Sequence, residues 1–225
     1  MLEIKDLHVR FHGSDHDAVG GISLTVADGQ IMGLVGESGS GKTVTAMVIS
    51  GLMPQRRADI SGQVLLDGKD LLALSPADMR KRQGCAISVV FQEPMSAMNP
   101  VMRIGPQVEE ALRVHTKLSP QERRERAPQA PRGGGLPDAQ ATTALDVTIQ
   151  AQILELLRRL NREMGMSILF ISHNLNVVRK LCSHVAVMEK GHIVETGETA
   201  QVFYDPQADY TKRLIAAIPT RKKLC

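Results

Sequence analysis

The chain has 225 residues, enough for one domain with a sizeable core, and its 43% apolar and 23% charged residues are ordinary for a soluble globular protein. A net charge of +3 is too small to indicate a nucleic-acid partner, and 3% aromatic residues without tryptophan argue against base-stacking platforms. Three widely separated cysteines without C-x-x-C spacing predict a reducing compartment and no structural zinc. We expect a cytoplasmic protein with no signal peptide or membrane span, so that membrane contact would come through a partner.

The first third of the chain alternates strand patterns with turns. Its expected elements are strands at 2–11, 22–26, 31–35 and 62–66, and a helix at 44–49. The pairs Asp28-Gly29 and Asp67-Gly68 are turn signals, and the second of them predicts a hairpin.

The middle of the chain begins with clear signals and then loses them. Ser75 and Pro76 predict a helix start, residues 86–91 have the length and apolarity of a buried strand, and a capping box at 119–122 opens another helix. Residues 127–141 contain three prolines and three consecutive glycines, which exclude a helix or central strand. We interpret that segment as a linker.

Regular patterns return in the last third. The apolar positions of residues 148–164 mark one helix face, and Gly165 is the expected C-cap. The remaining expected elements are a buried parallel strand at 167–172, a hairpin at 184–195 and helices near 200–203 and 210–217. Strands alternating with helices predict an α/β fold with a largely parallel sheet.

One segment matches the phosphate-binding pattern G-x-x-x-x-G-K-[ST] in full and lies between an apolar strand and a helix. Its residues are Gly36, Glu37, Ser38, Gly39, Ser40, Gly41, Lys42 and Thr43. The glycines allow backbone N–H groups to turn inward toward phosphate oxygens, and the helix N-terminus adds a favourable partial charge. Lys42 suits the β- and γ-phosphates, and the Thr43 hydroxyl suits magnesium. The chain is expected to bind a nucleoside triphosphate.

Three further motifs follow in order. Strands deliver Gln92 and His173, and Asp146 lies in a short loop before the long helix. With the phosphate loop, this constellation resembles the ATP-binding subunits of ABC transporters. Residues 91–100, 144–154 and 205–219 are similar to the oligopeptide, dipeptide and nickel importer branch of that family.

The resemblance implies a P-loop NTPase (ABC ATPase) core with a mostly parallel sheet, an N-terminal antiparallel β subdomain and a truncated helical subdomain. The ATP-binding domain would span residues 1–218, with 127–141 as an irregular junction and 198–225 as a short oligopeptide-transporter-like tail.

The resemblance also implies roles for individual residues. Phe11 would stack on adenine, although it also fits an ordinary core residue at a strand end. Gln92 would reach magnesium and the attacking water, Asp146 would act across a dimer interface, and His173 would contact the γ-phosphate.

The sequence departs from the family between Gln92 and His173. No Leu-Ser-Gly-Gly signature occurs, and the Walker B aspartate and catalytic glutamate positions fall on Ala139 and Gln140. Because glutamine is no base and a magnesium contact is lost, we expect impaired hydrolysis. An internal deletion that removes the signature and the Walker B motif would explain these differences.

The leading hypothesis is therefore the ATP-binding subunit of an ABC importer for peptides or nickel, which uses ATP and Mg²⁺ at the cytoplasmic face of the inner membrane. Its partners would be membrane permease subunits, a second ATP-binding subunit and, indirectly, a solute-binding protein, with no nucleic acid. The alternative is a non-catalytic nucleotide-binding remnant.

A GTPase or small-molecule kinase lacks support because no Asn-Lys-x-Asp motif occurs. The near-neutral charge and the tail argue against a DNA-repair ATPase.

Overall fold

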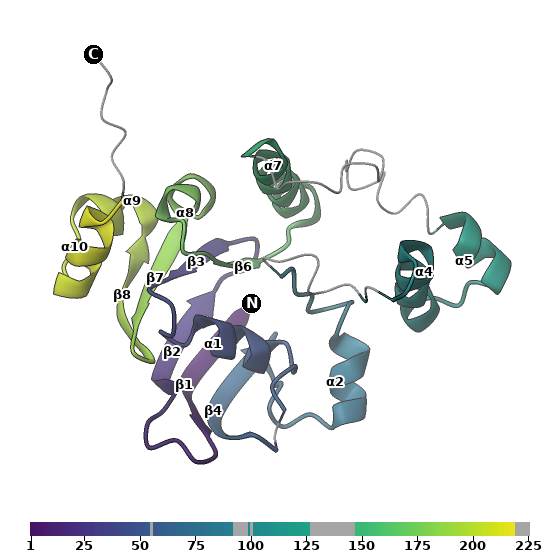
Figure 1. Ribbon diagram of the computed structural model, residues 1–225, viewed down its shortest axis with the longest axis horizontal. Coiled ribbons are helices and arrows are strands. Elements are labelled where there is room, and N and C mark those ends of the chain that lie inside the picture. The colour runs from purple at the N-terminus through teal and green to yellow at the C-terminus, as the bar shows by residue number, and fades with distance from the viewer. Residues whose placement is uncertain (55, 92–98, 100, 127–146, 219–225) are drawn as a thin grey trace. The chain divides into compact units, whose positions relative to one another are not determined.

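The computed structural model describes residues 1–54, 56–91, 99, 101–126 and 147–218. The chain divides into two compact units: the first combines Met1–Leu74 with Arg158–Cys225, and the second is Ser75–Leu157. Within the described residues there are eight helices and two four-stranded sheets (Figure 1). The α/β class expected from the sequence is confirmed.

The first sheet of the first unit is antiparallel and has the order β2-β1-β4-β5. Its strands are β1 (Leu2–Phe11), β2 (Val19–Val26), β4 (Ala58–Leu66) and β5 (Lys69–Asp70). The expected strand at 2–11 is confirmed, and Ile4, Leu7 and Val9 are buried between exposed or half-buried neighbours. The predicted hairpin is confirmed as well, with Asp67 and Gly68 at φ 51° and 76°. This sheet is the expected N-terminal antiparallel subdomain.

The second sheet of this unit has the order β6-β3-β7-β8 and is mostly parallel (Figure 1). Its strands are β3 (Ile31–Val35), β6 (Ile168–Ile171), β7 (His184–Glu189) and β8 (His192–Glu198). Strand β3 pairs in parallel with both β6 and β7, and all five of its residues are buried. The expected hairpin joins β7 to β8 through Lys190 and Gly191.

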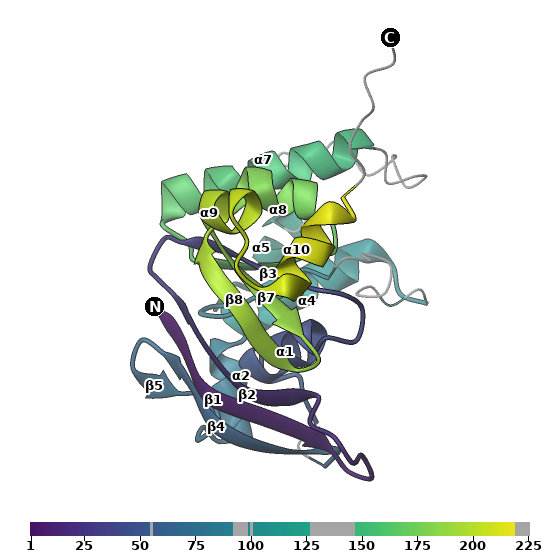
Figure 2. The same cartoon turned by 90° about the vertical axis from the view of Figure 1, so that its left-hand side faces the viewer.

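Helices cover both sides of this second sheet (Figures 1 and 2). In chain order they are α1 (Lys42–Ile49), the end of α7 (Val147–Met164), α8 (Leu175–Leu181), α9 (Thr199–Tyr204) and α10 (Asp209–Ala216). Helix α8 packs closely on β3 because Gly33 has no side chain: a Cβ there would lie 2.6 Å from Val178 Cγ1. Burial in the same contact raises the pKa of the Cys182 thiol to about 12.

The predicted long helix and its C-cap are also confirmed. Helix α7 ends at Met164, and Gly165 adopts the left-handed conformation with φ 64°. The Asn161 side chain fixes this end of the helix, since its Nδ2 donates hydrogen bonds to the carbonyl oxygens of Gly29 and Met166 at 2.8 and 2.6 Å.

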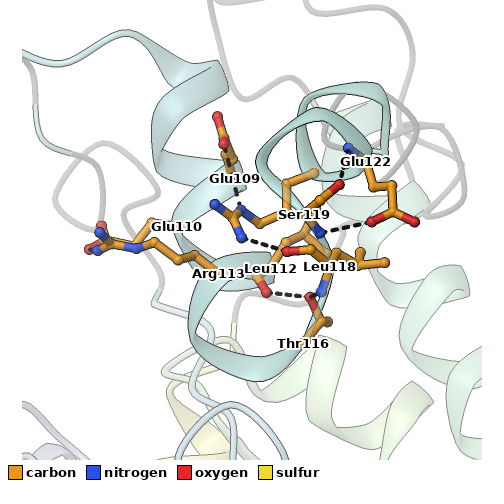
Figure 3. A network of polar contacts seen from close by, with 9 residues as sticks. Glu109, Glu110, Leu112, Arg113, Thr116, Leu118, Ser119 and Glu122 are labelled. Carbon is orange, nitrogen blue, oxygen red and sulfur yellow. Dashed lines mark hydrogen bonds and ion pairs between the residues drawn. The ribbon is translucent and has the colours of Figure 1, made fainter.

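The second unit contains α2 (Pro76–Arg82), α4 (Ile104–His115), α5 (Pro120–Arg126) and the beginning of α7. The predicted capping box is present: the Ser119 N–H donates to Glu122 Oε2 at 2.8 Å, and the Glu122 N–H donates to Ser119 Oγ at 3.4 Å (Figure 3). Arg123 of α5 forms an ion pair with Glu109 of α4 at 3.7 Å and donates to the Leu118 carbonyl at 2.6 Å. The Glu109–Arg123 ion pair connects the two helices.

One predicted strand of this unit is wrong. Residues 86–91 form no strand, and the pairing recorded for them within the described residues is an isolated bridge between Gln83 and Ile87. The Val90 side chain is 82% exposed and Phe91 is 43% exposed. A strand is stable only when its backbone N–H and C=O groups pair with a neighbour, and apolarity alone does not supply one.

The Glu195 carboxylate holds the start of α10, because it accepts hydrogen bonds from the N–H groups of Gln207 and Ala208 at 2.9 and 3.0 Å. Burial acts to raise the pKa of this carboxyl, but the hydrogen bonds outweigh burial and hold the pKa below its ordinary value. A lowered folded-state pKa means that the ionised carboxylate stabilises the fold above the ordinary pKa. That stabilisation is lost as the pH falls through the lowered value.

We therefore predict that Glu195→Gln lowers the free energy of unfolding at pH 7 by about 0.5–1 kcal/mol, a value reduced for partial solvent exposure. The difference from the unaltered chain should shrink below pH 4.5, the ordinary value of this carboxyl. Urea unfolding at both pH values measures it, with the exposed Glu198→Gln as the matched control. Equal losses in the two variants would contradict the role given to Glu195.

Candidate nucleotide-binding site

The phosphate loop lies where the sequence predicts it, between the end of β3 and the start of α1. Gly36, Gly39 and Gly41 have φ values of 148°, 81° and 105°, which side-chain-bearing residues rarely adopt. Gly41 is the N-cap of α1, and Lys42 is its first residue. The loop therefore places backbone N–H groups and the positive end of a helix at one point, as a phosphate site requires.

Two of these glycines are also required by close backbone neighbours. A Cβ on Gly36 would lie 2.1 Å from the Met188 carbonyl oxygen of β7. A Cβ on Gly41 would lie 2.5 Å from the carbonyl oxygen of Ala18, just before β2. The carbonyl oxygens of Met188 and Ala18, from two distant parts of the chain, thus form the wall behind the loop.

The Lys42 side chain folds back into the loop and is 9% exposed. Its Nζ donates to the carbonyl oxygens of Gly36 and Glu37 at 2.9 and 2.6 Å and to Ser40 Oγ at 3.0 Å. Burial lowers the pKa of this ammonium. Because all three acceptors are uncharged, an anion that reached Lys42 would compensate a buried cation that the loop leaves un-neutralised.

The outer side of the loop is held by two contacts that the sequence did not predict. The Gly191 N–H donates to the Ser40 carbonyl at 3.0 Å, and the Glu37 N–H donates to the Tyr210 hydroxyl at 3.0 Å. Tyr210 belongs to the tail motif, but no spacing in the sequence relates it to Glu37, which lies 173 residues earlier.

His173 lies at the same edge of the sheet as the loop. In the parallel pair β3–β6, Leu34 is opposite Ile171, so both strands deliver their following residues to one edge. The His173 side chain is exposed there, and the next residue, Asn174, caps α8 by accepting from the Val177 N–H at 3.4 Å. The structure therefore brings His173 to the required edge, while its contact with a γ-phosphate stays a prediction.

Of the remaining predicted site residues, the structure describes Phe11 but not Gln92 or Asp146. Phe11 is half-buried at the end of β1 opposite Ala58, so its stacking on adenine stays a prediction. Gln92, Asp146 and the junction 127–141 lie outside the described residues.

The Thr43 side chain is exposed at the second residue of α1, and its contact with magnesium stays a prediction. Magnesium commonly takes few protein ligands and completes its shell with phosphate and water oxygens. Among the described residues, no group of three or more His, Cys, Asp or Glu side chains is arranged to hold a metal on its own. No helix in the described part of the chain combines the length and apolarity needed to cross a bilayer.

Comparisons with known proteins identify the family. A family model described as ABC transporter matches residues 19–169. The chain is 37% identical to the oligopeptide transport ATP-binding protein OppD of Bacillus subtilis, covering 98% of this chain and 72% of that protein. It is 38% identical to the dipeptide transport ATP-binding protein DppD of the same organism, covering 97% and 77%. The chain therefore belongs to the ABC transporter family, close to the ATP-binding subunits of peptide importers.

Solved structures agree on the fold. The ATP-binding cassette MJ0796, solved as a dimer in a post-hydrolysis state with ADP and phosphate, has a TM-score of 0.75 at 21% identity. The match covers 88% of this chain and 99% of MJ0796. The cbiO1 protein of Clostridium perfringens, part of the ABC transporter complex cbiONQ, gives a TM-score of 0.71 at 21% identity over 91% of this chain and 90% of cbiO1.

The glycines of the loop allow a matched test of its geometry. Gly36→Ala should lower the free energy of unfolding by about 3 kcal/mol or more, because the new Cβ meets backbone as well as an unfavourable φ. Gly39→Ala should cost about 1 kcal/mol, since Gly39 also has a positive φ but a Cβ there meets nothing within 4 Å. Urea unfolding without nucleotide measures the free energy of unfolding of both variants. Similar decreases in the two would show that the Met188 carbonyl does not restrict a side chain at position 36.

Proposed function

We propose that this chain binds Mg-ATP through residues 36–43 and serves as the ATP-binding subunit of an importer for peptides or nickel. The observation that carries the proposal is Lys42, a buried ammonium surrounded by uncharged loop acceptors at a strand–loop–helix junction. The names of its relatives supply the class of solute, because OppD and DppD are described as oligopeptide and dipeptide transport proteins.

Binding requires Lys42 to exchange its partners. The ammonium leaves the carbonyl oxygens of Gly36 and Glu37 for phosphate oxygens, and loop N–H groups other than that of Glu37 donate to the same phosphates. The Thr43 hydroxyl would hold Mg²⁺, which neutralises charge on the phosphates when it is bound. His173 follows β6 at the same edge of the sheet, and we expect its side chain to contact the γ-phosphate.

The partners proposed for the chain follow from the family. Membrane permease subunits would receive the conformational signal, and a second ATP-binding subunit would complete each nucleotide site. The dimeric state named for MJ0796 supports the second partner. The proposed place of action is the cytoplasmic face of the inner membrane, with a solute-binding protein acting indirectly.

The central test is Lys42→Ala. We predict that this change weakens binding of Mg-ATP at least about 10-fold, because a charge-assisted contact to phosphate is lost. Isothermal titration of the full chain measures the affinity, with Lys69→Ala, an exposed lysine of β5, as the matched control. Unchanged affinity in a folded Lys42→Ala variant would refute the proposed site.

Three observations favour a second candidate function, nucleotide binding without turnover. Strand β6 is entirely apolar yet is the terminal strand of its described sheet, with all four residues only half-buried. Strands composed entirely of apolar residues are normally buried on both faces of a parallel sheet. The loss of a neighbouring strand would explain why the side chains of β6 are only half-buried. Residues 86–91 form no strand, and the pairing recorded for them is an isolated bridge from Ile87 to Gln83. The alignment with OppD spans 258 positions, more than the 225 residues of this chain. This chain therefore lacks residues that OppD has within the aligned region.

The sequence gives the chemical reason why turnover would fail. Ala139 and Gln140 occupy the positions where the family has its magnesium-contacting aspartate and its catalytic glutamate. An internal deletion between Gln92 and His173 would remove both the Walker B strand and the signature. The chain would then retain the phosphate loop and lose the groups that activate water.

This second candidate predicts no ATP turnover above the level of Lys42→Ala, even with an intact peptide-importer ATP-binding subunit present. Release of inorganic phosphate measures it under conditions where titration shows nucleotide bound. Turnover in the common enzyme range, about 1 s⁻¹ or faster, would reject this candidate and leave the catalytic subunit as the function.

A further inference from the structure

Helix α10 contacts the phosphate loop through the side chain of Tyr210. This side chain is 7% exposed, and its hydroxyl accepts the hydrogen bond from the Glu37 N–H at 3.0 Å. The ring is held in turn by Arg213, whose guanidinium carbon lies 5.9 Å from the ring centroid and which pairs with Glu189 of β7 at 3.6 Å. Glu195 fixes the start of the same helix through two backbone N–H groups. The tyrosine is thus positioned by the core sheet.

Tyr210 and Lys42 hold the same peptide unit from opposite edges. A trans peptide is planar, with its C=O and N–H pointing in opposite directions. In the unit that joins Gly36 to Glu37, the carbonyl accepts from Lys42 Nζ at 2.9 Å and the N–H donates to the Tyr210 hydroxyl at 3.0 Å. Glycine rotates more freely about its backbone than any other residue, so this unit depends on its partners for a fixed orientation.

The two contacts have different fates when a phosphate arrives. Lys42 releases the Gly36 carbonyl in order to reach phosphate oxygens. Tyr210 binds the N–H edge of the same peptide, which does not contact the phosphate, so its hydrogen bond can persist. Burial raises the pKa of the Tyr210 hydroxyl, and the Glu37 N–H opposes this effect only in part. The phenol is therefore neutral at physiological pH and stays available as an acceptor throughout.

We propose that Tyr210 is a positioning residue of the nucleotide site, whose hydroxyl keeps the Gly36–Glu37 peptide oriented while Lys42 exchanges loop carbonyls for phosphate. The inference rests on the proposed binding of ATP by residues 36–43. It gives the tail motif around Tyr210 a role in phosphate binding, in addition to packing on β8.

Replacement of Tyr210 by phenylalanine tests the role of one oxygen atom. Tyr210→Phe should weaken binding of both Mg-ATP and Mg-ADP by about 3- to 10-fold, the usual effect of one lost hydrogen bond. The matched control is Tyr204→Phe at the other tyrosine of the chain, which is 80% exposed on α9 and should bind normally. Titration gives the affinities, and thermal unfolding without nucleotide gives the stability of each variant.

A purely structural tyrosine would give a different pattern. In that case Tyr210→Phe would lower the thermal midpoint and leave the affinity of the folded protein unchanged, and this result would overturn the inference. Failure of the unaltered chain to bind nucleotide would overturn the proposed function, and the inference with it. Normal binding by both the unaltered chain and Tyr210→Phe overturns the inference alone.

A spectroscopic measurement keeps the inference testable if Tyr210→Phe does not fold. The chain has no tryptophan and two tyrosines, so Tyr204→Phe leaves Tyr210 as its single tyrosine fluorophore. Titration of this variant with Mg-ADP should change the Tyr210 emission saturably, with the affinity found by calorimetry, because the hydroxyl stays bound to a peptide whose carbonyl exchanges the Lys42 ammonium for a new environment. The change should disappear when Lys42→Ala is added. Constant emission while calorimetry shows binding would overturn the inference.

Discussion

The buried ammonium of Lys42 is the constraint on which the loop and its surroundings depend. A cation at 9% exposure needs acceptors, and three uncharged oxygen atoms of the loop supply them. These acceptors converge only because glycine at positions 36 and 41 lets the chain turn against the carbonyl oxygens of Met188 and Ala18. The site therefore combines satisfied hydrogen bonds with an uncompensated charge, which is the state that a phosphate relieves.

The wall of the loop comes from distant parts of the chain. Ala18 precedes β2, Met188 belongs to β7, Gly191 turns into β8, and Tyr210 lies in α10. Each contact is made by or to a backbone group of the loop, so the wall fixes its conformation with little dependence on loop side chains. A substitution in the tail around Tyr210 can therefore alter the conformation of the phosphate loop, although the tail itself would make no contact with a phosphate.

Local signals predicted most of this architecture. The strand–loop–helix order around Lys42, the capping box at 119–122 and the hairpin turn at Asp67-Gly68 each depend on a few neighbouring residues, and all are confirmed. Non-local features were missed or wrong. No local signal relates Tyr210 to Glu37, and helix α4 begins without a side-chain cap at Arg103. The run at 86–91 looked like a buried strand because apolarity is local, whereas pairing needs a second strand.

In the second candidate function, nucleotide binding would persist without turnover because the two would depend on different segments of the chain. The recorded contacts of Lys42 and Tyr210 lie within Met1–Leu74 and Arg158–Cys225, the unit that holds both sheets. From the sequence we expect the two carboxylate positions of the family at Ala139 and Gln140, within residues 127–141. Strand β3 keeps a neighbour on each side, β6 and β7, so the loop it carries remains supported. Strand β6 has β3 on one side only within the described sheet. A lost strand at that edge would therefore remove catalytic groups and leave the phosphate loop intact.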